Sequence, residues 1–148
     1  NCHVVLPELF NTQGNKIVEI KLADDLKNPF VRGIDATTGK KTFNNGNYGV
    51  IYDVHFNTGG KNETLVQFSP EGGLYAGYGK IGEEGQLKLV GLPEGETAFG
   101  KAGREEAIVV GTIPGGKKGE MIFSPPGSSN LPIKIILIPE KVLQKITK

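Results

Sequence analysis

The chain has 148 residues, of which 37% are hydrophobic and 22% charged, a composition typical of a folded globular protein rather than a disordered segment. Its formal charge of +1 gives no electrostatic reason to expect nucleic acid as a partner. No apolar run approaches the roughly 20 residues of a membrane span, so we expect none. The 22 glycines and nine prolines follow no Gly-X-Y period, which excludes collagen and indicates many tight turns.

The first residues carry little information about function. The chain begins with Asn1, so we expect a processed protein or an excised domain, and a removed signal peptide would fit. Cys2 is the single cysteine, so no internal disulfide can form, and we interpret it as a thiol in a frayed terminus. Residues 3–6 form a short apolar lead, and residues 16–22 alternate as a strand does.

The longest strand signal runs from Val50 to Asn57, between two turn sequences rich in glycine. Apolar side chains alternate with polar ones along it: Val50, Tyr52, Val54 and Phe56 on one face, and Asp53, His55 and Asn57 on the other. Period 2 is the pattern of a strand with one buried face. We therefore expect a central strand of a β-sandwich, with the four apolar residues in its core.

Further short strands follow at intervals of about 8 to 12 residues. They are predicted over residues 64–69, 74–81, 86–90, 107–113, 120–124 and 132–138, and the last contains the most apolar run, which we expect to be buried on both faces. The pattern predicts a single all-β domain over residues 1–148, an antiparallel β-sandwich that is either Ig-like or jelly-roll-like. Residues 139–148 are expected to be a short C-terminal helix or a linker.

The polar segment over residues 35–47 is long for a connection and is therefore a candidate binding loop. Its polar side chains, Asp35, Asn44, Asn45 and Asn47, offer hard oxygens to a calcium ion, or else they serve as turn-forming residues. We expect Phe43 to fill one end of the sandwich, because phenylalanine is mostly buried.

Other motifs point away from catalysis. Residues 77–82 spell G-x-G-x-x-G, but no helix can follow them, so we do not expect nucleotide binding. With only His3 and His55 as imidazoles, we expect no metal and no cofactor. The acid pairs at 83–84 and 105–106 lie in glycine-rich segments, and solvated turns explain them better than catalysis. Because the sequence does not place these pairs in space, a glycan-active hydrolase stays as one alternative.

A glycan site is the other alternative, because aromatic rings stack on sugars and amides bond their hydroxyls. Tyr52 lies on the apolar face of its strand, so three tyrosines remain available. The candidate ligand-binding residues are Asn44, Asn45, Asn47, Tyr48, Tyr75 and Tyr78. We predict that Tyr48 and one of the other two tyrosines lie close together.

Three segments resemble those of a known group of proteins: 33–52 with its Gly-Ile-Asp-Ala-Thr-Thr-Gly start, 69–77 and 125–133. They are similar to an uncharacterised β-sandwich segment of secreted Gram-positive bacterial proteins that carry copper-amine-oxidase-like N-terminal repeats or surface-layer homology repeats. The resemblance implies export and a location at the cell surface. It implies no copper or quinone chemistry, because Asn47-Tyr48-Gly49 lacks the acidic third residue of the amine oxidase cofactor motif.

We therefore predict a non-enzymatic, secreted or cell-surface β-sandwich module for binding or spacing. Its expected partner is a cell-wall glycan or another surface protein.

Overall fold

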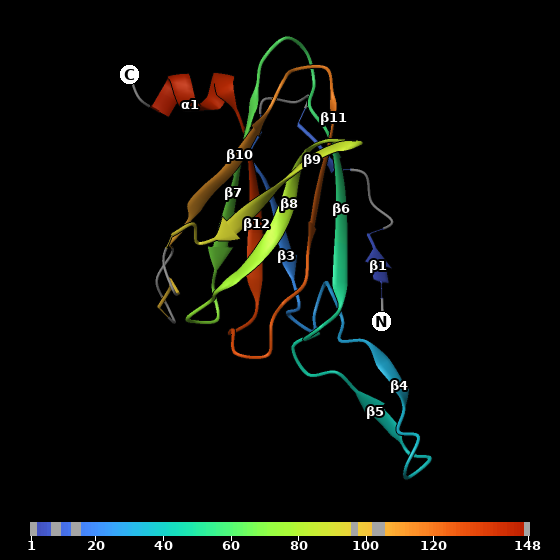
Figure 1. Cartoon of the computed structure of the whole chain (residues 1–148). Coiled ribbons are helices and arrows are strands. Elements are labelled where there is room, and N and C mark those ends of the chain that lie inside the picture. The colour runs from blue at the N-terminus through green and yellow to red at the C-terminus, as the bar shows by residue number, and fades with distance from the viewer. Residues whose placement is uncertain (1–2, 7–9, 13–15, 96–97, 102–105, 147–148) are drawn as a thin grey trace.

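A computed structural model describes residues 3–6, 10–12, 16–95, 98–101 and 106–146. Within these ranges the chain is nearly all β, as the sequence predicts, and two sheets face each other in a sandwich (Figure 1). The first sheet, here sheet A, contains β1 (His3–Val5), β2 (Phe10–Asn11), β6 (Ile51–Asn57), β8 (Gly77–Glu83), β9 (Gln86–Leu92) and β11 (Lys118–Phe123). Sheet B contains β3 (Val18–Leu22), β7 (Thr64–Pro70), β10 (Ile108–Ile113) and β12 (Ile133–Pro139).

The strand order explains how distant segments meet. Sheet A has the order β1-β6-β11-β8-β9, with β2 also paired to β6, and sheet B has the order β10-β7-β12-β3. Most pairings are antiparallel, as expected, but β1 and β2 both pair with β6 in parallel. Strand β11 lies between β6 and β8 although it follows them by many residues, and this position brings its side chains beside those of both.

Strand β6 has the two-faced character that its sequence predicts. Val50, just before it, and Tyr52, Val54 and Phe56 within it are all buried in the core. Asp53 and His55 point to the outer face of sheet A, because side chains alternate along a strand.

Aromatic rings join the two sheets through the core. Tyr52 and Phe123 of sheet A stack with ring centroids 5.3 Å apart, and Phe68 from sheet B makes a T-shaped contact with Phe123, with ring centroids 5.7 Å apart. The Phe56 ring covers the backbone of Gly119, its partner on β11, where a Cβ atom would collide with the ring. Such buried rings dominate the energetics of a small core.

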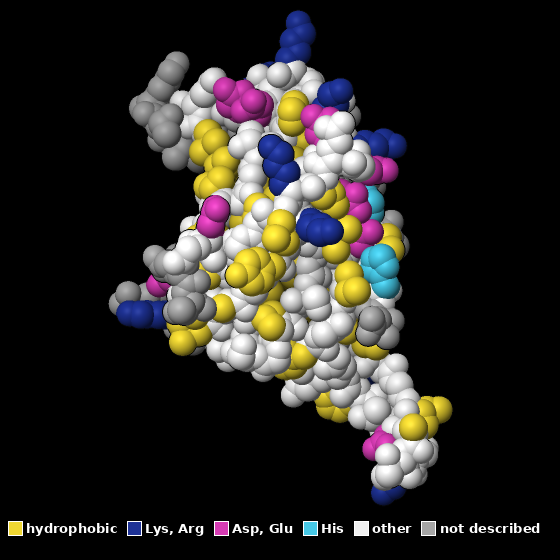
Figure 2. All heavy atoms as spheres, viewed as in Figure 1, with side chains coloured by type: hydrophobic (Ala, Val, Ile, Leu, Met, Phe, Trp, Pro, Cys, Tyr) yellow, Lys and Arg dark blue, Asp and Glu magenta, His cyan; other side chains and the backbone are white. Residues whose placement is uncertain are grey.

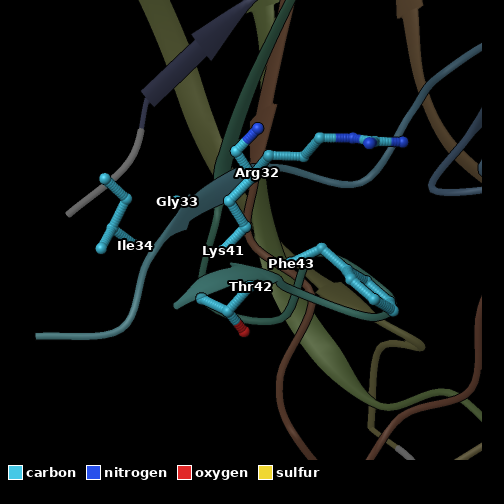
Figure 3. A pocket seen from close by; sticks show the side chains of 6 residues that line it. All are labelled: Arg32, Gly33, Ile34, Lys41, Thr42 and Phe43. Carbon is cyan, nitrogen blue, oxygen red and sulfur yellow. The ribbon is translucent and has the colours of Figure 1, made fainter. Parts of the chain in front are cut away.

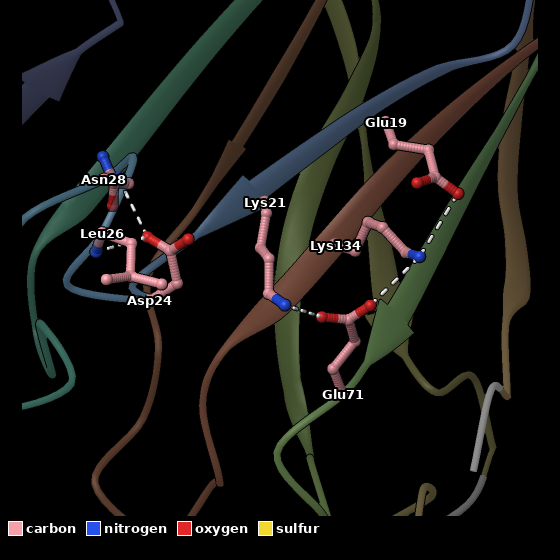
Figure 4. Close-up of polar contacts among 7 residues, drawn as sticks. All are labelled: Glu19, Lys21, Asp24, Leu26, Asn28, Glu71 and Lys134. Atoms are coloured by element: carbon pink, nitrogen blue, oxygen red, sulfur yellow. Dashed lines mark hydrogen bonds and ion pairs between the residues drawn. The ribbon is translucent and has the colours of Figure 1, made fainter. Parts of the chain in front are cut away.

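Strand β12 is buried on both faces, as predicted, although it carries a lysine on the outer face of sheet B. Lys134 Nζ lies 3.0 Å from Glu71 Oε1 and 3.2 Å from Glu19 Oε1, and Lys21 Nζ lies 2.9 Å from Glu71 Oε2 (Figure 4). Burial opposes the charge on Lys134, but the contacts with Glu71 and Glu19 outweigh it and raise the pKa of the lysine. We call these four side chains the ion-pair network.

The predicted loop over residues 35–47 is not one loop. Strands β4 (Arg32–Ile34) and β5 (Lys41–Phe43) pair as a hairpin that projects from the sandwich (Figure 1). Phe43 does not fill the end of the sandwich: it is 60% exposed and stacks on Phe30, with ring centroids 6.4 Å apart. The prediction for Phe43 is wrong because the ring finds a partner on the same projecting arm rather than in the core.

The C-terminal tail forms the predicted helix, α1 (Glu140–Ile146), which packs near the end of β12. Val142 and Leu143 are half-buried, as a marginal helix requires. Among the described residues, no helix is long and apolar enough to cross a membrane.

Candidate functional site

Two of the predicted ligand-binding residues are structural. Tyr75 is 0% exposed, packs against Phe68 and so presents no ring face to a ligand; burial raises the pKa of its hydroxyl. Asn47 is also buried, and its amide accepts a hydrogen bond from the backbone N–H of Val31 (2.7 Å) and donates one to the Tyr52 hydroxyl (2.6 Å). The prediction that these two side chains contact a ligand is therefore corrected.

The remaining loop residues are mostly engaged with the protein itself. The Asn44 amide donates to the backbone carbonyl of Tyr48, and the Tyr48 hydroxyl donates to the carbonyl of Ser129, both over 2.8 Å. Asp35 accepts the backbone N–H groups of Thr37 and Thr38, as in an Asx turn, and these bonds lower its pKa. Asn45 alone of the three asparagines is exposed, so the turn-forming alternative explains the segment better than a calcium site.

Among the three candidate tyrosines, Tyr78 is the one that is exposed, with 71% of its surface accessible on β8. It points to the outer face of sheet A, because Gly79 and Ile81, which point to the opposite face of the strand, are buried. Its partner on β9 is Gly91, which has no side chain to cover the ring, and the exposed Leu89 lies diagonally beside it. The G-x-G-x-x-G run lies within this strand.

The same face carries a cluster of ionisable side chains closer to β6. Because β11 pairs Glu120 with His55 and Ile122 with Asp53, four residues of two strands share this surface. His55 Nε2 lies 3.1 Å from Asp53 Oδ1 and 3.9 Å from Glu120 Oε1. Figure 2 shows the histidine side chains beside acidic ones on the side of the molecule where β6 lies.

Two further residues adjoin this cluster from the strands on either side. His3 of β1 places its Nε2 3.7 Å from Asp53 Oδ2, and Glu84, just after β8, places its Oε2 3.8 Å from His55 Nδ1. We call the five residues His3, Asp53, His55, Glu84 and Glu120 the His–carboxylate cluster.

The electrostatics of the cluster are unusual for a surface. Burial raises the pKa of Glu120, and the hydrogen bond and negative charge of Asp53 raise it further. Asp53 is only 8% exposed, and its Oδ1 atom is buried yet accepts no hydrogen bond from the described part of the chain. Buried oxygens without a donor are rare in native proteins, so this one requires an explanation.

The sequence pattern brought together only two of the five residues of this cluster. Asp53 and His55 alternate visibly on β6, and the sequence analysis places them on the same face. Glu120 and Glu84 could not be assigned to them, because no sequence signal gives the position of β11 between β6 and β8. The expectation of no metal was based on the presence of only two histidines, and the sequence did not show which carboxylates lie beside either of them.

A hollow lies on the β4–β5 hairpin, with a volume of about 420 Å³ (Figure 3). It is lined by Arg32, Gly33, Ile34, Lys41, Thr42 and Phe43. Ile34 and Phe43 are exposed there, and both charged groups are cationic. Nothing in the structure shows what would cover it, so we assign it no ligand.

Comparison with known proteins adds little. No protein-family model and no curated protein matches the chain. Among solved structures, the chain is similar to a crystal structure of a GH26-CBM35 β-(1,4)-mannanase from Podospora anserina, at 11% sequence identity and a TM-score of 0.47. The match covers 84% of this chain and 28% of the mannanase chain, so the protein spans well under a third of that enzyme. A likeness at this level carries no argument about activity or ligand.

Proposed function

We propose that the protein is a non-enzymatic, secreted or cell-surface binding module, and that the outer face of sheet A is its ligand-binding surface. The observation that carries this proposal is the exposed pair Tyr78 and Leu89 beside the His–carboxylate cluster on one sheet. Ligand-binding surfaces commonly combine exposed apolar side chains with hydrogen-bonding groups beside them. The location follows from the resemblance to secreted Gram-positive segments.

A glycan is the ligand that this surface suits best. A sugar offers an apolar face to an aromatic ring and hydroxyl groups to carboxylates and lysines, and Lys80 stands between Tyr78 and the cluster on this face. Tyr48, Asn44 and Asn45 lie on the loop after the hairpin and are secondary to Tyr78 in this proposal. A protein ligand would use the same exposed pair but would not be released by sugar.

The test is a glycan array with the whole chain, followed by binding measurements on Tyr78→Ala. Loss of the ring should weaken glycan binding roughly 10-fold, the value of one aromatic contact. Val109→Ala is the control, because Val109 is also an exposed apolar side chain, on sheet B, and its truncation should leave binding unchanged. Equal binding by wild type and Tyr78→Ala would refute the assignment of this face.

The non-enzymatic part of the proposal needs its own measurement. A reducing-end assay on every glycan that binds should show no hydrolysis above the buffer control. Turnover that disappears in Asp53→Asn or Glu120→Gln would instead support the hydrolase alternative, since those are the two carboxylates that face each other.

A further inference from the structure

We propose that Asp53, His55 and Glu120 form a binding site for a divalent transition-metal ion, with Zn²⁺ as the ion that fits best. The three residues each offer one donor atom, and these atoms all lie within 4.8 Å of one another. The proposal does not depend on the glycan function, because it concerns the protein alone.

The donor spacing fits a tetrahedral ion. Zn²⁺ binds imidazole nitrogen and carboxylate oxygen at about 2.0–2.2 Å, which holds neighbouring donors about 3.4 Å apart. The separations from His55 Nε2 are 3.1 Å to Asp53 Oδ1 and 3.9 Å to Glu120 Oε1, on either side of that value. Small rotations of side chains on two adjacent paired strands would bring all three donors to the ion.

The buried Asp53 oxygen is a second observation at this site, because its ion-pair contact with His55 lacks hydrogen-bond geometry. Asp53 is more than nine-tenths buried, and its Oδ1 faces His55 Nε2 without receiving a hydrogen bond. An ion between the two atoms would satisfy this oxygen. It would also neutralise two carboxylates that otherwise repel each other across the surface of β6 and β11.

The surroundings of His55 resemble the outer shell of a metal site. Ligating histidines commonly direct the second ring nitrogen to a carboxylate, which fixes the tautomer. Here Nδ1 faces Glu84 Oε2 at 3.8 Å, so Nε2 is the nitrogen left for the ion. His3 Nε2 lies 3.7 Å from Asp53 Oδ2 and either orients that carboxylate or supplies the fourth donor. The mixture of nitrogen and oxygen donors favours Zn²⁺ over Ca²⁺ or Mg²⁺, which prefer oxygen alone.

The first experiment is calorimetric titration of Zn²⁺ into tag-free protein that has been stripped with a chelator and dialysed. We expect one ion per chain, with Ca²⁺ and Mg²⁺ binding far more weakly. His55→Ala and Asp53→Asn should each weaken binding by more than 100-fold, and Glu84→Gln by about 10- to 100-fold, as an outer-shell partner does. Glu94→Gln, an exposed acid in the turn after β9, should bind like wild type.

The second experiment reports directly on the imidazoles. The chain has two histidines, so His3→Ala assigns both sets of ring signals in an NMR spectrum. Zn²⁺ should shift the His55 ring signals most, and circular dichroism of each variant shows whether it is folded. The proposal is overturned if Zn²⁺ binds no tighter than about 100 μM. It is equally overturned if folded His55→Ala binds like wild type, if only His3 responds, or if Ca²⁺ binds in preference to Zn²⁺.

Discussion

The outer faces of the two sheets both carry clusters of charged side chains, but the charges are arranged differently. On sheet B, Glu19, Lys134, Glu71 and Lys21 alternate in sign along the ion-pair network, so every charge has an opposite neighbour. On sheet A, the carboxylates of Asp53, Glu84 and Glu120 surround His55, and negative groups are in excess.

The pKa shifts express the same contrast. The contacts with two lysines overcome burial and lower the pKa of Glu71, whereas burial and Asp53 raise that of Glu120. On sheet B the two lysines balance the charges of the two glutamates, so that network stabilises the fold without a ligand. A cluster that leaves a carboxyl group poorly compensated is the better candidate for binding. A shifted pKa alone therefore does not identify a binding site. The direction of the shift is what distinguishes the two clusters.

Both faces depend on one core, so the largest effect should come from removing a shared core ring. Phe56→Ala deletes a fully buried ring that covers Gly119 and lies on the strand that carries Asp53 and His55. We expect a loss of about 3–5 kcal/mol in the free energy of unfolding, as for other core phenylalanines. Chemical denaturation measures it. A loss below 1 kcal/mol would mean that β6 does not form the centre of the sandwich.

The next largest effect should come from breaking the network on sheet B. Lys134→Met leaves Glu71 and Glu19 facing each other without the ammonium between them, and we expect a loss of about 2 kcal/mol. Lys134→Met combined with Glu71→Gln should recover part of it, because replacing a buried pair is milder than removing one partner. A double variant less stable than the single one would contradict the assigned role of the network.

The two faces should also differ in their response to acid. Glu71 has a pKa below its ordinary value of 4.5, so its contribution to the free energy of unfolding is fully present above pH 4.5. It should be lost as the pH falls through the lowered pKa of the folded state. Thermal melts of wild type and Glu71→Gln between neutral and acidic pH measure this: the variant should be less stable at neutral pH, and the two curves should converge in acid. Parallel curves would show that Glu71 gains nothing from its lysines.

The smallest effect should have the opposite sign. Glu120→Gln removes one of the crowded carboxylates on sheet A, and in metal-free protein it should raise the free energy of unfolding by about 0.5 kcal/mol, the scale of a cross-strand charge contact. Glu19→Gln on sheet B is the matched control and should lower it. If both changes destabilise the protein, the contrast between the faces is wrong.

The sequence predicts those parts of the fold that depend on the pattern of neighbouring residues. The alternation over Val50 to Asn57 is sufficient to predict β6 and its buried face. The β4–β5 hairpin was missed because each strand has three residues and every one of them is exposed, so neither has an apolar period. The ion pairs of Lys134 were missed for the opposite reason. The apolar run around Lys134 correctly predicts a buried strand, but it does not reveal the two glutamates that pair with the buried lysine.

The candidate site was harder to predict because it is assembled by pairing between distant strands. Glu120 becomes a neighbour of His55 only when β11 enters between β6 and β8, and the sequence does not specify this order. Tyr75 was misjudged for a related reason: its ring packs on Phe68 of sheet B, which the pattern of residues around Tyr75 does not reveal.

The pairing of strand β1 bears on how firmly His3 belongs to the cluster. It pairs through three residues along one edge of β6, and short edge segments open more often than the interior of a sheet. His3 belongs to β1, whereas Asp53 and His55 belong to β6 and Glu120 to β11, which are interior strands of the sheet. Detachment of β1 would withdraw His3 while the other three residues stayed in place, so ion binding by Asp53, His55 and Glu120 should persist when this strand opens.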